Sequence, residues 1–344
     1  MKDFVQTVTG KVKKDDLGIC LVHEHFFNNL SGCVDEPFYP YSKFIADKKV
    51  SADIAYGLRY DPYCNKDNMS EKDVSDVLYE VEKFIEIGGK TVVEATGSAS
   101  IGRNIKKIHE VASAKNINVI ASTGYYLSKF ETEEKLLRKP EMIAMEYDRD
   151  LNVGIDGTDI KAGLIGELGV SPNFTSGEKN NLRAGAIAQQ LNPDVSINIH
   201  MPGWMRFGDE VLDIVVTEMG ANPEKISLAH SDPSGKDFDY QKRLLDRGVF
   251  IEFDMIAQDI SFPKEGIGPS VFETVENVYN LIKQGYENQI VLSHDVFLKQ
   301  MWTKNGGNGF IFVPTVFVSL LMQKGVSEST INKLLKLNPA KLLA

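Results

Sequence analysis

The sequence predicts an α/β protein of the (β/α)8 class, also called the TIM barrel. Eight short apolar runs alternate with amphipathic helical patterns along most of the chain, and this order of elements builds a closed parallel barrel. The length of 344 residues also suits one such barrel with insertions. No linker or change in composition marks a second domain. We therefore expect a single domain over residues 1–344.

The N-terminal residues 1–17 place valines among polar neighbours and predict a short β-hairpin. The first barrel strand follows and ends at residues 21–25, which read LVHEH. Because alternate strand residues face the same side, His23 and His25 are expected to point together, with Glu24 pointing away.

A long insertion is expected at about residues 26–70. This stretch is rich in tyrosine and proline and has no sustained periodicity. A loop of this length inside a compact domain is usually functional, for example an active-site lid, or is partly disordered.

From about residue 70 the alternation becomes regular. The remaining strands are expected at 91–96, 119–123, 162–168, 196–200, 226–230, 249–254 and 290–295. The helices are expected at about 74–87, 104–114, 133–148, 178–191, 209–219, 240–247, 271–284 and 327–335.

Composition limits the partners and the location. The formal net charge of −10 argues against nucleic acid, which requires a basic footprint, but not against a small anionic ligand. No apolar run is long enough to span a membrane, and the charged N-terminus lacks an apolar signal region. The three cysteines form no CxxC pair, which fits reduced thiols. We therefore expect a cytoplasmic protein without a membrane partner.

Ligand-type side chains recur at the ends of the expected strands, where parallel barrels carry their active residues. These residues are His23 and His25 (strand one), Glu167 (strand four), His200 (strand five), His230 (strand six) and Asp295 (strand eight). Each alone could be a hydrogen-bonded core histidine or a loop carboxylate. Their joint occurrence at five strand ends favours a metal site. His109 and His294 are interpreted as structural.

Four imidazoles and two carboxylates suffice to hold two divalent ions that share an oxygen ligand. Glu167 has two oxygens and suits the shared position. A metal ion lowers the pKa of its bound water to about 7, so hydroxide is available at neutral pH. Asp295 would hold the attacking water and accept its proton.

These residues resemble the phosphotriesterase-related, lactonase-like branch of the amidohydrolase superfamily. The matching stretches are residues 21–25 (LVHEH), 95–97 (ATG), 123–126 (TGYY), 161–165 (KAGLI), 292–295 (LSHD), 305–307 (NGG) and 338–340 (NPA), with the strands that end in His200 and His230. The resemblance covers nearly the whole chain. It implies a (β/α)8 barrel, a binuclear centre, usually of zinc (with Mn²⁺ or Co²⁺ as alternatives), hydrolysis of esters, lactones or phosphotriesters, and often a homodimer.

The chain departs from this family pattern at the end of strand four. Better-known members bridge the two metals there with a carboxylated lysine, whereas this sequence has Gly166 followed by Glu167. Some relatives use a glutamate, and the bridging role is therefore assigned to Glu167.

The resemblance also bears on the substrate. Lactonases of this branch carry a tyrosine in the loop after strand three, and Tyr126 fits that position, ordinary aromatic packing being the alternative. Basic residues on the loops of one rim favour an anionic substrate. They are Lys299, Lys236, Lys304 and Arg206, with Lys264 in the loop after strand seven. We therefore expect hydrolysis of a lactone by metal-bound hydroxide, and a phosphorylated sugar lactone is the favoured substrate.

Other functions stay open at this point. A phosphotriesterase or an acyl-homoserine lactonase of the same fold would use the same metal ligands. A deoxyribonuclease from the related barrels would need basic grooves, which the net charge opposes. Outside catalysis, a non-catalytic metal-bound barrel could act as a binding protein.

Overall fold

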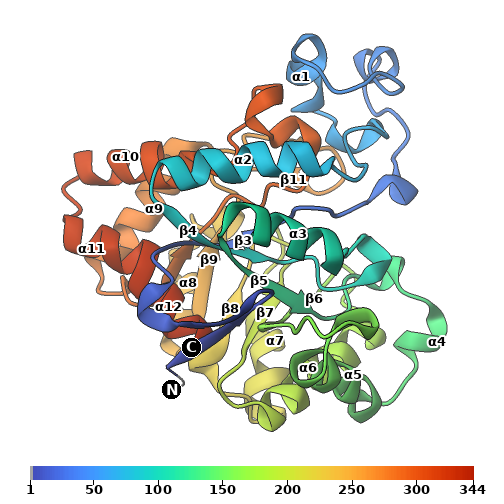
Figure 1. Ribbon diagram of the computed structural model, residues 1–344. Coiled ribbons are helices and arrows are strands. Elements are labelled where there is room, and N and C mark those ends of the chain that lie inside the picture. Colours follow the sequence, from blue (N-terminus) through green and yellow to red (C-terminus); the bar gives the residue numbers. More distant parts are fainter. Residues whose placement is uncertain (1–2) are drawn as a thin grey trace.

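The computed structural model describes residues 3–344 and contains an eight-stranded parallel sheet that curves into a barrel surrounded by helices (Figure 1). Its strands are hydrogen-bonded in the order β12-β9-β8-β7-β6-β5-β4-β3. The two edge strands meet near their carboxyl ends, where the backbone N–H of Asp295 donates to the carbonyl of His23 (3.1 Å). The barrel is therefore nearly closed, and the predicted fold class is confirmed. No helix in the described part of the chain has the length and apolar character that a bilayer-spanning helix requires.

All eight predicted barrel strands are present. They are β3 (Ile19–Glu24), β4 (Gly89–Glu94), β5 (Asn118–Thr123), β6 (Leu164–Gly169), β7 (Ser196–His200), β8 (Ile226–Leu228), β9 (Phe250–Phe253) and β12 (Ile290–Leu292). The last strands are shorter than expected, so His230 and Asp295 lie in the loops just beyond β8 and β12.

The helices outside the barrel follow the predicted order with two corrections. They are α2 (Val74–Glu86), α3 (Ile105–Lys115), α4 (Glu133–Leu136), α5 (Pro140–Asn152), α6 (Ser176–Leu191), α7 (Gly208–Leu212), α8 (Phe238–Asp246), α9 (Val271–Lys283), α10 (Val318–Gln323), α11 (Glu328–Asn332) and α12 (Asn338–Leu343). The helix expected at 133–148 is divided into α4 and α5, because Pro140 fits the first turn of a helix and not its interior. Helices α10 and α12 were not predicted.

The predicted N-terminal hairpin is formed by β1 (Phe4–Thr7) and β2 (Gly10–Lys13). Together with α12 it lies at the end of the barrel where both termini are found (Figure 1). An apolar cluster fills this end. Its buried members are Val5, Leu17, Cys20, Val22, Val93, Ile120, Leu164, Phe250, Val291, Leu342, Leu343 and Ala344. The polar residues of the barrel interior lie toward the opposite end, where the strands have their carboxyl ends.

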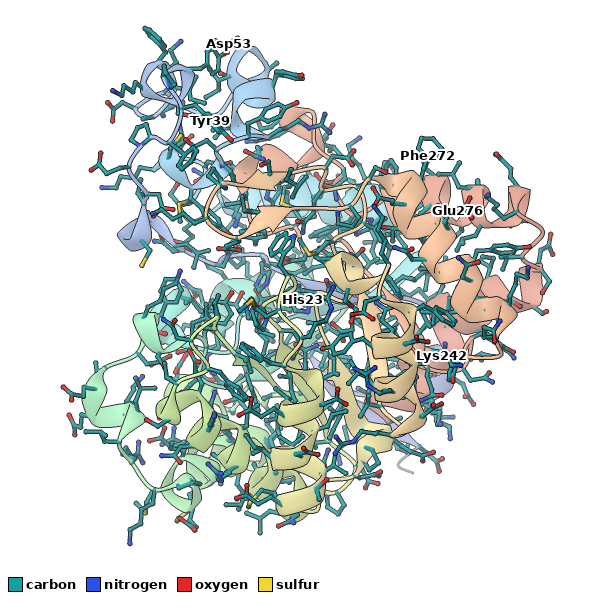
Figure 2. The ribbon with its side chains drawn as sticks, turned by 180° about the vertical axis from the view of Figure 1, so that it is seen from behind. His23, Tyr39, Asp53, Lys242, Phe272 and Glu276 are labelled. Atoms are coloured by element: carbon teal, nitrogen blue, oxygen red, sulfur yellow. The ribbon has the colours of Figure 1, made fainter. Side chains whose placement is uncertain are left out.

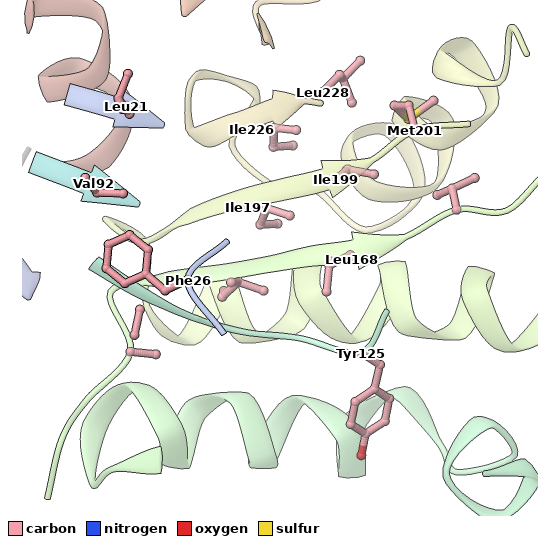
Figure 3. Packing of buried hydrophobic residues seen from close by; sticks show 14 of the residues in the cluster. Leu21, Phe26, Val92, Tyr125, Leu168, Ile197, Ile199, Met201, Ile226 and Leu228 are labelled. Carbon is pink, nitrogen blue, oxygen red and sulfur yellow. The ribbon is translucent and has the colours of Figure 1, made fainter. Parts of the chain in front are cut away.

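The main core lies between the strands and the helices. On β7, Ile197 and Ile199 belong to this core together with Leu168 of β6 (Figure 3). Asn198 lies between the two isoleucines and points into the barrel, where its amide donates to Glu252 Oε1 (2.9 Å). The alternation predicted for this strand is therefore present, with an apolar outer face and a polar inner face.

The insertion at 26–70 stands over the carboxyl end of the barrel (Figure 1). It contains α1 (Ala52–Leu58), which the sequence did not reveal because seven residues give too little periodicity, and which Figure 1 shows far from both termini. Asp67 accepts from Lys299 Nζ (2.8 Å), and Asn68 donates to Gln300 Oε1 (3.0 Å). These bonds fix the insertion to the loop that follows β12.

Glu24, the middle residue of the His-x-His stretch, holds the barrel closed. Its carboxylate accepts from Ser293 Oγ (2.8 Å), from the backbone N–H and Nδ1 of His294 (3.0 and 2.8 Å) and from the backbone N–H of Val296 (2.9 Å). We predict that Glu24→Gln lowers the free energy of unfolding by about 2 kcal/mol or more, because an amide group would face buried donors. Urea denaturation measures this loss.

The control is Glu110→Gln, at an exposed position on α3, which should leave the unfolding free energy unchanged. Equal stability of the Glu24 variant and the wild type would contradict the closing role of Glu24.

Candidate metal centre

The predicted metal ligands converge at the carboxyl end of the barrel, where Figure 2 labels His23 beneath the insertion that carries Tyr39 and Asp53. His25 Nε2 lies 3.6 Å from Glu167 Oε1 and 3.2 Å from Asp295 Oδ1. His23 Nε2 lies 3.6 Å from Glu167 Oε2 and 3.9 Å from Asp295 Oδ1. The two imidazoles from β3 therefore face the same two carboxylates.

The other two histidines, His200 at the end of β7 and His230 just after β8, also approach Glu167. His200 Nδ1 lies 3.1 Å and His230 Nε2 lies 3.8 Å from Glu167 Oε2, and the two nitrogens are 2.8 Å apart. Two groups of mutually close ligand atoms result, and Glu167 belongs to both. This arrangement matches a carboxylate shared between two ion sites.

Local irregularities of the backbone aim these side chains into the barrel. Strict alternation would place Glu167 on the outer face with Ile165, but the β6–β7 register shifts between Ile165 and Leu168. His230 and Asp295 adopt left-handed backbone angles (φ 56° and 51°), a conformation that costs a non-glycine residue of order 1 kcal/mol or more and clusters at functional sites.

A second layer of acceptors fixes the orientation of three imidazoles. His23 Nδ1 lies 3.1 Å from Glu252 Oε2, and His230 Nδ1 lies 3.0 Å from Asp254 Oδ1. Each carboxylate accepts the Nδ1 hydrogen, which leaves the lone pair on Nε2 facing the centre.

His25 is oriented by a neutral group in the same way. The Thr96 hydroxyl donates its single hydrogen to Glu94 Oε1 (2.7 Å), so its oxygen accepts from His25 Nδ1 (2.8 Å). Three of the four histidines therefore direct Nε2 toward Glu167.

Sequence reasoning missed Glu252 and Asp254. They occupy alternate positions in and just after the apolar strand β9, so they share the face of the barrel interior. Two acidic residues two positions apart in a buried strand are a signal of this arrangement.

The donor set fits divalent cations. His23 Nε2 is buried and makes no hydrogen bond to any residue of 3–344. Burial alone would lower the pKa of His23, yet Glu252, Glu167, Asp254 and Asp295 together raise it to about 10. Buried carboxylates thus surround imidazole nitrogens with an excess of negative charge, which two cations would balance.

The electrostatics of Glu167 point to the same conclusion. Burial would raise its pKa, but the neighbouring His200 and His230 hold it well below the ordinary value. Glu167 is therefore a carboxylate, as a shared ligand must be.

A cavity of about 760 Å³ opens onto the centre. Tyr126 lines it, with the hydroxyl 3.3 Å from His200 Nδ1 and the two ring centroids 4.8 Å apart. The remaining wall is mostly apolar and aromatic, including Tyr63, Trp204 and Phe262. The loops after several strands and the insertion at 26–70 all contribute to it.

Of the five basic residues expected on the rim, Lys264 lines this cavity, whereas Lys299, Lys236, Lys304 and Arg206 do not. Lys299 pairs with Asp67 (2.8 Å) and Arg206 with Asp237 (3.2 Å). The other two, Lys236 and Lys304, pair with Glu273 and Asp76. Each loop cation has a carboxylate close by on the surface, which sequence spacing could not reveal.

Comparisons with known proteins give a consistent picture. The model of the phosphotriesterase family matches residues 3–343. The N-acetyltaurine hydrolase of Dictyostelium discoideum is 31% identical over 362 residues, which cover 98% of this chain and 97% of that protein.

Two solved structures are similar to the whole barrel. A resiniferatoxin-binding protein from Rhodobacter sphaeroides has a TM-score of 0.95 and 36% identity, covering 99% of this chain and 95% of that one. The phosphotriesterase homology protein from Escherichia coli, solved with phosphate in its active site, has a TM-score of 0.78 and 26% identity, covering 96% of this chain and 100% of that one.

The shared position of Glu167 yields a prediction about metal content. Glu167→Gln should lower the bound metal from two ions per chain to one or none, because an amide is a poor ligand for two cations at once. Elemental analysis after loading and desalting measures this ratio. Glu265→Gln changes a carboxylate that lines the same cavity and should keep two ions, and equal metal content in the two variants would contradict the shared role.

The orienting role of Glu252 yields a second prediction. Glu252→Gln should weaken metal binding by about 10–100-fold, since a carboxylate that orients a ligand imidazole also raises its basicity. Competition with a chromophoric chelator measures the dissociation constant. Glu80→Gln alters an equally buried glutamate on α2 and should leave the metal dissociation constant unchanged. A wild-type dissociation constant for the Glu252 variant would refute the orienting role of Glu252.

Proposed function

The chain belongs to the phosphotriesterase family, and on this premise we propose that it is a metal-dependent hydrolase that opens a lactone ring. One observation carries the proposal: four imidazoles and two carboxylates from five strand ends meet at the floor of a large, mostly apolar cavity. The proposed ligands are His23, His25, Glu167, His200, His230 and Asp295.

When bound, two divalent ions would lower the pKa of a water molecule and polarise the scissile carbonyl. Zn²⁺ is the proposed ion, because it accepts both imidazole nitrogen and carboxylate oxygen, with Mn²⁺ or Co²⁺ as alternatives.

Asp295 is the proposed proton carrier. Its Oδ1 lies 3.2 Å from His25 Nε2, and its Oδ2 is 3.4 Å from the Gln258 amide nitrogen, which donates to it. Asp295 accepts a proton from the attacking water and returns it to the alkoxide that leaves as the ring opens. Gln258 keeps the carboxylate aimed at the cavity.

Tyr126 is proposed to orient the ring. Its hydroxyl is close enough to His200 to reach a substrate held over the centre, and burial raises its pKa well above the ordinary value. The phenol therefore stays neutral and donates a hydrogen bond to a lactone oxygen. The apolar walls exclude bulk water from the reacting groups.

The proposed substrate is a phosphorylated sugar lactone. An N-acyl amide is the second candidate, favoured because relatives from Dictyostelium discoideum and Xenopus tropicalis that match 98% of this chain are named N-acetyltaurine hydrolases. Pentonolactones with and without a 5-phosphate, together with N-acetyltaurine, distinguish the two. A cytoplasmic location and a homodimer also stand as proposals.

Hydrolysis itself is tested with Asp295→Asn. We predict that this variant keeps most of its metal and loses turnover of the preferred compound by about 100-fold or more, because proton transfer is lost. Elemental analysis and titration of released acid measure the two quantities. A wild-type protein that binds these compounds without cleaving any of them would instead be a binding protein.

A further inference from the structure

Besides the carboxylates of the metal centre and the helix-capping Glu178, four charged side chains line the cavity. They are Asp35 of the insertion, Lys129 of the loop after β5, and Lys264 and Glu265 of a small hairpin formed by β10 (Ser261–Phe262) and β11 (Gly266–Ile267). Lys264 Nζ lies 2.6 Å from Asp35 Oδ1. These two charges compensate each other and tie the hairpin to the insertion.

The other two charges have no such partner. Neither Lys129 Nζ nor the Glu265 carboxylate forms a hydrogen bond or ion pair with any residue of 3–344. Lys129 Nζ instead lies 5.0 Å from the centre of the Phe130 ring. Desolvation raises the pKa of the Glu265 carboxyl, and the positive charges of Lys129 and His230 act in the opposite direction. Both residues line the cavity and are exposed to solvent.

A continuous wall leads from Lys129 to the metal centre. The Phe130 ring packs against Tyr126 with 5.5 Å between centroids, and Tyr126 packs against His200 at 4.8 Å. A substrate held over the centre and lying along this wall would bring its distal end to the ammonium group. The distal end of the substrate would meet the Lys129 ammonium group, whose partner in the protein is the face of the Phe130 ring.

We propose that Lys129 binds an anionic group of the substrate at the end remote from the scissile bond, and that Glu265 weakens this binding. The inference rests on the proposed hydrolytic function and adds a substrate class: small lactones or acyl compounds that carry a phosphate, sulfonate or carboxylate. It assigns the anion preference to Lys129, which lines the cavity, and not to the cations outside it, Lys299, Lys236, Lys304 and Arg206.

The test uses matched pairs of compounds on the metal-loaded protein. The pairs are pentonolactones with and without a 5-phosphate, and N-acetyltaurine with its neutral counterpart N-acetylethanolamine. Lys129→Met should raise KM for the anionic members about tenfold or more, since a hydrogen bond to a charged group is lost. KM for the neutral members should stay within about twofold of the wild-type value, because a neutral compound forms no such bond.

Three further variants sharpen the result. Lys129→Arg should restore most of the affinity for anions, and Glu265→Gln should lower KM for the anionic compounds while leaving the neutral ones unchanged. Lys236→Met removes an exposed cation outside the cavity and should change neither. Equal effects of Lys129→Met on both members of a pair, or no effect on either, would overturn the inference.

Binding without turnover separates this inference from the proposed function. Calorimetric titration of metal-loaded Asp295→Asn should show tighter binding of the anionic member of each pair, and the added Lys129→Met change should abolish the difference. If Asp295→Asn alone binds both members of a pair equally, the inference is overturned, even if the wild type hydrolyses the neutral compounds. A clear preference in a wild type that cleaves nothing would support Lys129 and refute hydrolysis.

Discussion

The contact of Glu167 with both pairs of histidines is the interaction on which the rest of the structure depends. A carboxylate buried at the floor of a cavity is costly unless positive charge or strong donors surround it. Here the nearest groups are imidazoles that Glu252, Asp254 and Thr96 orient with their Nε2 atoms inward. Bound cations would balance the negative charge of this polar network.

The barrel fold serves this requirement. An apolar cluster closes the amino-terminal end of the barrel, while the polar residues of the inner face lie toward the carboxyl end. Glu24 then joins β3 to the segment after β12, so that histidines near the start of the chain meet Asp295 near its end. Fold closure and assembly of the centre therefore depend on the same stretch of sequence.

The sequence was sufficient to predict the strands, the helix order and the residues that converge, because alternation and strand-end position are local patterns. It was less informative where geometry departs from those patterns. Alternation alone would have placed Glu167 outside the barrel, whereas its position at a strand end and the family resemblance assigned it to the metal site. The partners of Lys299 and Lys236 lie far away in the sequence, so their charges could not be located from spacing. Glu252 and Asp254 carried a readable signal that strand-end reasoning overlooked.

The central claim is that two cations share Glu167, and anomalous diffraction from crystals of the metal-loaded protein tests it most directly. We expect two anomalous peaks, one beside His23 and His25 and the other beside His200 and His230, with the Glu167 carboxylate between them. A single peak held by His23, Glu252 and Asp254, whose ligand atoms also lie close together, would contradict it, as would the absence of any peak at the carboxyl end of the barrel.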